Sequence, residues 1–183
     1  MSQTILVKSV SSLSEARYCS GMMVDYISFD LNPESDDYVA KEQFEEIKNW
    51  LSGVKILGSF ATNDIFEIIS ALKTYSLDGF IFDSTQLKML DEIDVSEKFL
   101  EVDDRTEFTD GLNVNYIVSD TINENIEAWQ SNYNVLLGYK FENVSVISDK
   151  IAGYAFKGSR ELRPGINNYD GLMEALETLE DRA

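Results

Sequence analysis

The sequence contains no histidine, which restricts the chemistry that the chain can perform. Histidine is the commonest general base near neutral pH and the commonest ligand of transition metals. Any catalysis would therefore fall to carboxylates, lysine or tyrosine, and any metal would be one that prefers oxygen ligands, such as Mg²⁺ or Ca²⁺. Nothing in the sequence indicates a cofactor.

Aspartates gather where predicted strands end. They are Asp30, Asp83, Asp103, Asp104 and Asp120. If several of them meet at one edge of a sheet, their oxygens could bind a divalent cation, and the chain would be a metal-dependent enzyme acting on a small molecule. The alternative, which we favour, is that they are helix caps and surface acids in a very acidic chain. We therefore predict no metal site.

One basic loop has the composition of a phosphate site. Lys157-Gly158-Ser159-Arg160 follows the last predicted strand, with Arg163 close behind and Lys140 possible as a neighbour in space. Loops at this place in α/β barrels commonly bind phosphate through backbone N–H groups. We predict phosphate binding at Gly158, Ser159 and Arg160, and hence a small phosphorylated metabolite as ligand; a solvated turn with basic side chains is the other interpretation.

Short apolar, β-branched runs alternate with helical patterns along the whole chain, which is typical of βαβ units on a parallel sheet. The strands are predicted at 5–10, 26–31, 54–60, 79–83, 98–102, 116–119, 135–139 and 151–156. Helices are predicted at 12–22, around 44–51 and 65–72, more briefly at 86–90, 122–130 and 144–147, and after Pro164-Gly165. A capping box of Ser12 and Glu15 is predicted to start the first helix.

Eight strands that alternate with helices predict a (β/α)8 barrel of the TIM type. We expect a single barrel domain over residues 1–183, because no linker or low-complexity tract interrupts the pattern. The chain is short for this fold, so helices in its second half should be shortened or missing.

The charge balance excludes two classes of partner. Fifteen basic residues stand against 33 acidic ones, which gives a net charge of −18. Binding to nucleic acid or to anionic membranes requires basic surfaces, so neither is expected. The single cysteine, Cys19, cannot form an internal disulfide, which agrees with a cytoplasmic location and with a role in packing. The sequence identifies no protein partner.

The motifs along the chain resemble those of phosphoribosylanthranilate isomerase, a (β/α)8 enzyme of tryptophan biosynthesis that performs an Amadori rearrangement. That family begins with a strand of the type VKICGIT, a helix of the type LEDA and a loop of the type PKSPRYV. Here LVKSVS at 6–11, LSEA at 13–16 and PESDDYV at 33–39 keep the same spacing without a gap. VKILGSF at 54–60 is similar to the family's third strand, and Pro164-Gly165 to its last loop.

The resemblance implies where the catalytic groups should be. In the family a cysteine that ends the first strand is the general base on the sugar C2 proton, and Lys8 stands at that position. Lys8 would either act as the base or form a structural salt bridge, and we favour the salt bridge. The general acid of the family ends the sixth strand, where either Ser119 or Asp120 stands, and Asp120 is equally suited to cap the next helix.

The family's substrate-binding positions carry other residues here. The arginine of PKSPRYV, which contacts the anthranilate carboxylate, corresponds to Asp37, and the histidine of the QLHG segment corresponds to Asp83. A reversed charge at position 37 would repel that anion. The family's glycine-rich loop after the sixth strand corresponds here to residues 121–125, which contain no glycine. The family's glycine pair after the seventh strand corresponds to Gly138-Tyr139, and the tyrosine side chain could fill the space that a phosphate would need.

These substitutions lead to a main hypothesis and two alternatives. The main hypothesis is a divergent isomerase-like barrel with little or no isomerase activity that retains at most the binding of a phosphorylated ligand. The first alternative is an active isomerase that uses Lys8 and Asp120. The second is the metal-dependent enzyme described above.

Overall fold

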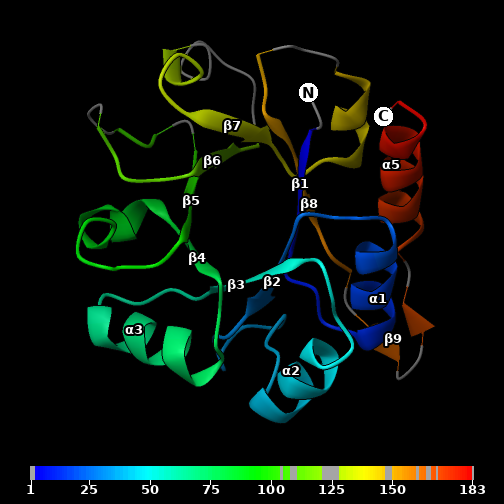
Figure 1. Cartoon of the computed structure of the whole chain (residues 1–183), viewed down its shortest axis with the longest axis horizontal. Helices are drawn as coiled ribbons and strands as arrows, with labels where there is room; N and C mark the ends of the chain where they lie inside the picture. The colour runs from blue at the N-terminus through cyan, green and yellow to red at the C-terminus, as the bar shows by residue number, and fades with distance from the viewer. Residues whose placement is uncertain are drawn as a thin grey trace.

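Eight parallel strands form a closed barrel, in which each strand pairs with its neighbours in chain order and β8 pairs with β1 (Figure 1). The computed structural model describes residues 3–103, 105–107, 111–120, 128–146, 150–159, 161–163, 166–167 and 169–182, with 161–163 and 166–167 described in their backbone only. The strands are β1 (Thr4–Lys8), β2 (Tyr26–Asp30), β3 (Lys55–Ser59), β4 (Gly79–Phe82), β5 (Glu97–Val102), β6 (Tyr116–Ser119), β7 (Asn134–Leu137) and β8 (Gly153–Lys157). The predicted fold class is confirmed, and each strand lies within two residues of its predicted bounds.

Helices cover the outside of the barrel (Figure 1). They are α1 (Leu13–Gly21), α2 (Lys41–Lys48), α3 (Ile65–Thr74) and α5 (Asp170–Glu180). After β4 and β7 the chain forms only the short 3-10 helices η1 (Ser84–Met89) and η2 (Phe141–Ser145). The prediction of shortened helices in the second half is confirmed. Residues 121–127, the larger part of the helix predicted at 122–130, lie outside the described residues.

One short hairpin was not predicted. After β8 the chain forms β9 (Glu161–Arg163) and β10 (Ile166–Asn167), which pair antiparallel to each other beside the barrel. The pattern of apolar residues carries no sign of it because both strands are too short to show alternation.

The barrel interior is filled by one cluster of side chains to which every strand contributes. These are Leu6, Tyr26, Leu57, Ile81, Phe99, Val118, Leu136 and Ala155. Side chains two residues further along a strand point to the same face, so inward-facing residues later in each strand reach the carboxyl end of the barrel. The interior is thus a packed core with functional positions above it.

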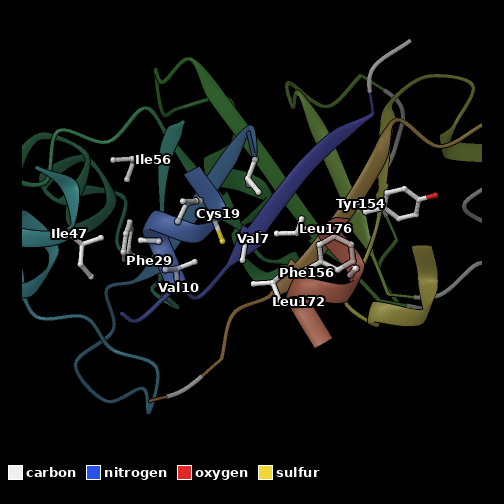
Figure 2. Packing of buried hydrophobic residues seen from close by; sticks show 14 of the residues in the cluster. Val7, Val10, Cys19, Phe29, Ile47, Ile56, Tyr154, Phe156, Leu172 and Leu176 are labelled. Atoms are coloured by element: carbon white, nitrogen blue, oxygen red, sulfur yellow. The ribbon is translucent and has the colours of Figure 1, made fainter. Parts of the chain in front are cut away.

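A second core lies between the strands and the helices. Figure 2 shows Val7 of β1 and Phe156 of β8 in one cluster with Cys19 of α1 and Leu172 of α5. Cys19 is fully buried, and burial raises the pKa of its thiol, so it is a packing residue as predicted. No helix in the described part of the chain is long and apolar enough to span a membrane.

The amino end of the barrel is closed by polar contacts between strands. The Tyr26 hydroxyl donates to Glu97 Oε2 over 3.0 Å, and Lys55 forms an ion pair with the same carboxylate. These contacts stabilise the amino end of the barrel. Functional sites of this fold lie at the opposite end, where the strands end at their carboxyl termini.

Candidate functional site

A cavity of about 510 Å³ opens at the carboxyl ends of the strands. Its walls come from β1, β2, β5 and β6 and from the segments that follow β2, β5, β6 and β7, together with the end of β8. The lining residues are Lys8, Ser9, Asp30, Ser35, Asp37, Glu101, Val102, Asp103, Val118, Asp120, Tyr139 and Lys157. Lys8, Asp37 and Asp120, which the resemblance places at family site positions, are all among these residues and therefore meet in one cavity.

Lys8 is held by a carboxylate that the sequence analysis did not identify. Lys8 comes two positions after the interior residue Leu6, and Glu101 comes two positions after the interior residue Phe99. Both side chains therefore lie on the inner face of their strands and point into the mouth. Lys8 Nζ lies 2.6 Å from Glu101 Oε1 and 2.5 Å from Oε2. About one fifth of each side chain is exposed, 21% and 22%. The predicted salt bridge of Lys8 is present, and its partner is Glu101.

Tyr139 completes this group from the end of β7. Its hydroxyl donates to Glu101 Oε1, and its ring centroid lies 5.7 Å from Lys8 Nζ. Burial is the main cause that raises the pKa of Tyr139 well above its usual value, and the charges of Glu101 and Asp120 add to the effect. The phenol is therefore a hydrogen-bond donor at neutral pH. The side chain lines the cavity, and the prediction that it fills the space of a phosphate stays a prediction.

Of the two candidates for the general acid, Asp120 lines the cavity. Val118 faces the barrel interior, and Asp120 is on the same side of the strand two residues later. Ser119 points the other way and is only 2% exposed. Asp120 itself is exposed, at the rim.

Asp37 forms an ion pair across the mouth with Lys157, the last residue of β8. Lys157 Nζ lies 2.9 Å from Asp37 Oδ2. Position 37 thus carries a carboxylate whose side chain is only 14% exposed, and this carboxylate is directed at the second lysine of the described lining.

Asp30 and Asp103 accept hydrogen bonds from their own loops. Asp30 accepts from the Asn32 N–H and, over 2.6 Å, from the Ser35 hydroxyl. Asp103 accepts from the Thr106 hydroxyl and the Arg105 N–H, and these bonds lower its pKa. In the described part of the chain no three metal-binding side chains come together, and Asp104 lies outside it. The hydrogen bonds give Asp30 and Asp103 structural roles in their loops, while the absence of a metal site stays a prediction.

Asp83 lies outside the cavity. It is the N-cap of η1, where it accepts from the Thr85 N–H over 2.8 Å and forms a capping box with Gln86. The structure thus shows a structural use for this position, while the prediction that it takes part in substrate binding stays a prediction.

The two described amides of the predicted phosphate loop have acceptors inside the chain. The Gly158 N–H donates to the Lys8 carbonyl oxygen over 2.7 Å. The Ser159 N–H and hydroxyl donate to Glu15 Oε1 over 2.7 Å and 3.1 Å. Glu15 is fully buried, and this burial raises its pKa. Arg160 lies outside the described residues.

Similarity to known proteins is found in structure and not in sequence. No protein-family model matches the sequence, and no curated protein matches it. Among solved structures, TrpF from Jonesia denitrificans superposes with a TM-score of 0.75 at 10% identity, covering 97% of both chains. Phosphoribosyl anthranilate isomerase from Thermus thermophilus gives 0.74 at 14% identity, covering 98% of this chain and 100% of that one. The fold is that of the phosphoribosylanthranilate isomerases.

A third similar structure carries a ligand. It is a phosphoribosyl anthranilate isomerase in complex with reduced 1-(o-carboxyphenylamino)-1-deoxyribulose 5-phosphate, with a TM-score of 0.72, 18% identity and coverage of 98% of this chain and 99% of that one. At these identities the likeness establishes the isomerase-like fold alone, and the chemistry of the mouth must be argued from its own residues.

The lining of the mouth is acidic. Its charged groups are five carboxylates and two amines. Both amines are in ion pairs, Lys8 with Glu101 and Lys157 with Asp37. Among the residues that the structure describes, the cavity therefore offers no unpaired cation in its lining and has a strong excess of negative charge.

Proposed function

We propose that this chain is a divergent phosphoribosylanthranilate isomerase-like barrel that does not catalyse the isomerisation at an enzyme-like rate, because its mouth does not bind the anionic substrate. The single observation that carries the proposal is the pairing of both lining amines, Lys8 and Lys157, with carboxylates inside an acidic cavity. A low-dielectric cleft of one charge sign repels ligands of the same sign.

The substrate of the similar enzymes would be unfavourably placed here. The ligand of the solved complex carries a carboxylate and a phosphate, as its name states. Asp37 stands where the resemblance places the arginine for the carboxylate, and the Gly158 and Ser159 amides already have internal acceptors. Residual phosphate binding at this loop stays a prediction, and the acidic lining argues against it.

The alternative, an active isomerase, has one observation in its favour. Lys8 and Asp120, its proposed base and acid, both line the cavity. Both hypotheses have Lys8 and Asp120 in the cavity. They differ in whether the anionic substrate binds there. The metal-dependent enzyme has no comparable support among the described residues.

The decisive experiment supplies purified chain with phosphoribosylanthranilate and follows the loss of its fluorescence. The Thermus thermophilus enzyme serves as the positive control. We expect a rate at least about 10³-fold below that control, since the loss of even one preorganised group typically costs on the order of 10² to 10³ in rate. Turnover at an enzyme-like rate that Lys8→Ala and Asp120→Ala each abolish would establish the alternative.

A further inference from the structure

We propose that Lys8 forms a Schiff base with small uncharged hydroxyaldehydes or hydroxyketones in the barrel mouth, with Glu101 as its proton acceptor and counter-ion. The choice of an uncharged ligand rests on the proposed function, because it follows from the acidic lining. The formation of the Schiff base rests on the geometry around Lys8 alone.

The first argument is the position of the amine. Lys8 Nζ reaches the cavity from the end of β1, yet only 21% of the side chain is exposed. A lysine amine can attack a carbonyl carbon and form a Schiff base with it. The other lining lysine, Lys157, is 56% exposed at the rim and is paired with one oxygen of Asp37. Lys8 is thus the amine that a ligand inside the cavity would meet.

The second argument is the carboxylate. Lys8 Nζ lies within 2.6 Å of both carboxylate oxygens of Glu101, so a proton can pass from the ammonium group to this oxygen pair without any movement of the backbone. The Tyr139 hydroxyl, which donates to Oε1, holds the carboxylate in place. Glu101 acts here on the reacting amine, whereas Tyr139 is a positioning residue.

The reaction balances with these groups alone. The ammonium of Lys8 transfers a proton to Glu101, and the amine forms a C–N bond to the carbonyl carbon. The carbonyl oxygen takes the proton back from Glu101, and a second proton from the nitrogen releases this oxygen as water. The nitrogen keeps the third proton of the original ammonium, so the product is the iminium and no proton is taken from solvent. The iminium has the same charge as the original ammonium, so the ion pair with Glu101 persists.

The class of ligand follows from the rest of the lining. A cavity of about 510 Å³ accommodates a molecule of a few carbon atoms. Asp30, Asp103 and Asp120 present carboxylate oxygens, which accept hydrogen bonds from hydroxyl groups. The same carboxylates repel a phosphate or a carboxylate on the ligand. An uncharged hydroxyaldehyde satisfies both conditions.

The test is reductive trapping on the unmodified chain. Glyceraldehyde and cyanoborohydride are added, and the labelled lysines are identified by peptide mass spectrometry over time. Lys41 on α2 is the internal reference, because its side chain is 48% exposed against 21% for Lys8. Accessibility alone predicts faster labelling of Lys41. We expect Lys8 to be labelled at least about tenfold faster, because Glu101 takes up its proton.

Two comparisons make the result specific. Glu101→Gln, checked for folding by circular dichroism, should slow labelling at Lys8 by about tenfold and leave Lys41 unchanged, since it removes the proton acceptor. Glyceraldehyde 3-phosphate should label Lys8 at least about fivefold more slowly than glyceraldehyde, because of the acidic lining.

Each contrary outcome identifies what fails. Labelling of Lys41 as fast as Lys8 in the unmodified chain overturns the Schiff base, whatever the variants do. Preferred labelling of Lys8 by the phosphorylated sugar overturns the choice of an uncharged ligand. Isomerase turnover in the assay above refutes the proposed function, and the ratio of Lys8 to Lys41 labelling remains a separate readout.

Discussion

Glu15 on α1 and Ser159 after β8 are joined by two hydrogen bonds, although 144 residues separate them in the chain. One carboxylate oxygen, Oε1, accepts both bonds, while Oε2 is buried without a hydrogen-bond partner among the described residues. Burial outweighs the hydrogen bonds and raises the pKa of Glu15. The contact fastens the loop after β8 to the first helix and uses a backbone donor of the predicted phosphate loop.

Glu15→Gln tests the energetic consequence of this burial. A raised pKa means that the folded chain binds the proton of Glu15 more tightly than the unfolded chain, whose value is about 4.5. The stability that this group contributes is full below that pH and is lost as the pH rises through the folded-state pKa. Glutamine keeps an acceptor for Ser159 without the charge. We therefore expect a higher urea midpoint than the unmodified chain at pH 8, and a difference that vanishes toward pH 4.

Glu34→Gln is the matched control for this prediction, because it removes one negative charge at an exposed loop position. An equal gain from both variants would mean that the relief of overall charge repulsion, at a net charge of −18, explains the effect. A lower midpoint of Glu15→Gln at every pH would contradict the argument from burial.

The barrel could be predicted from sequence because each strand carries its own local signal. Runs such as Tyr26–Asp30 and Tyr116–Ser119 are apolar and β-branched, and turn residues separate them from amphipathic helices. The alternation of strands and helices predicts a parallel sheet, and the count of eight strands predicts that it closes into a barrel. The β9–β10 hairpin had no such signal, because two- and three-residue strands show no period.

The site was only partly predictable because its key contacts depend on closure of the barrel. Lys8 and Asp120 were found at the mouth from the ends of their strands and from the resemblance. Glu101 was missed, although it follows Phe99 with the period of a strand face, because its pairing with Lys8 spans 93 residues. For Glu15 the local capping rule predicted a contact with Ser12. Ser12 does accept from the Glu15 N–H, but the carboxylate turns to Ser159.

Alkaline pH should reveal two protected tyrosines. Burial is the main cause that raises the pKa of both Tyr26 and Tyr139, and each also donates to a glutamate. The folded chain therefore retains these protons where the unfolded chain, near pH 10, releases them. The stability that they contribute is full below about pH 10 and is lost as the pH rises further.

Ultraviolet titration of tyrosinate checks this prediction. We expect Tyr26 and Tyr139 to be the last of the nine tyrosines to ionise, and to do so when the chain unfolds. Tyr26→Phe and Tyr139→Phe should each remove one chromophore from the late phase. A titration in which all nine ionise together near pH 10 in the folded chain would show that the two phenols are not buried donors.

Barrel closure should depend on the absence of a side chain at Gly153. A Cβ there would lie 1.8 Å from the carbonyl oxygen of Thr4, on the neighbouring strand β1. Because backbone on both sides is fixed by strand pairing, Gly153→Ala should destabilise the chain by at least about 3 kcal/mol. Gly21→Ala is the control: nothing lies within 4 Å of its Cβ at the end of α1, and we expect a gain of about 0.5 kcal/mol. Urea midpoints measure both, and equal midpoints would contradict the register of β1 and β8.

The charge of the mouth can be reversed at the position where the resemblance places an arginine. Asp37→Arg removes the partner of Lys157 and adds a cation, so two positive groups would face the cavity that now holds the ion pair. We expect inorganic phosphate, titrated by calorimetry, to bind at least about fivefold more tightly than to the unmodified chain, because the local potential changes sign. Added salt should weaken this gain, since the cavity is open to solvent. Asp36→Arg makes the same change of net charge on an exposed neighbour outside the cavity lining. If Asp36→Arg strengthens phosphate binding equally, the effect belongs to the overall charge and not to the mouth; if only Asp37→Arg does so, the acidic lining is what keeps anions out.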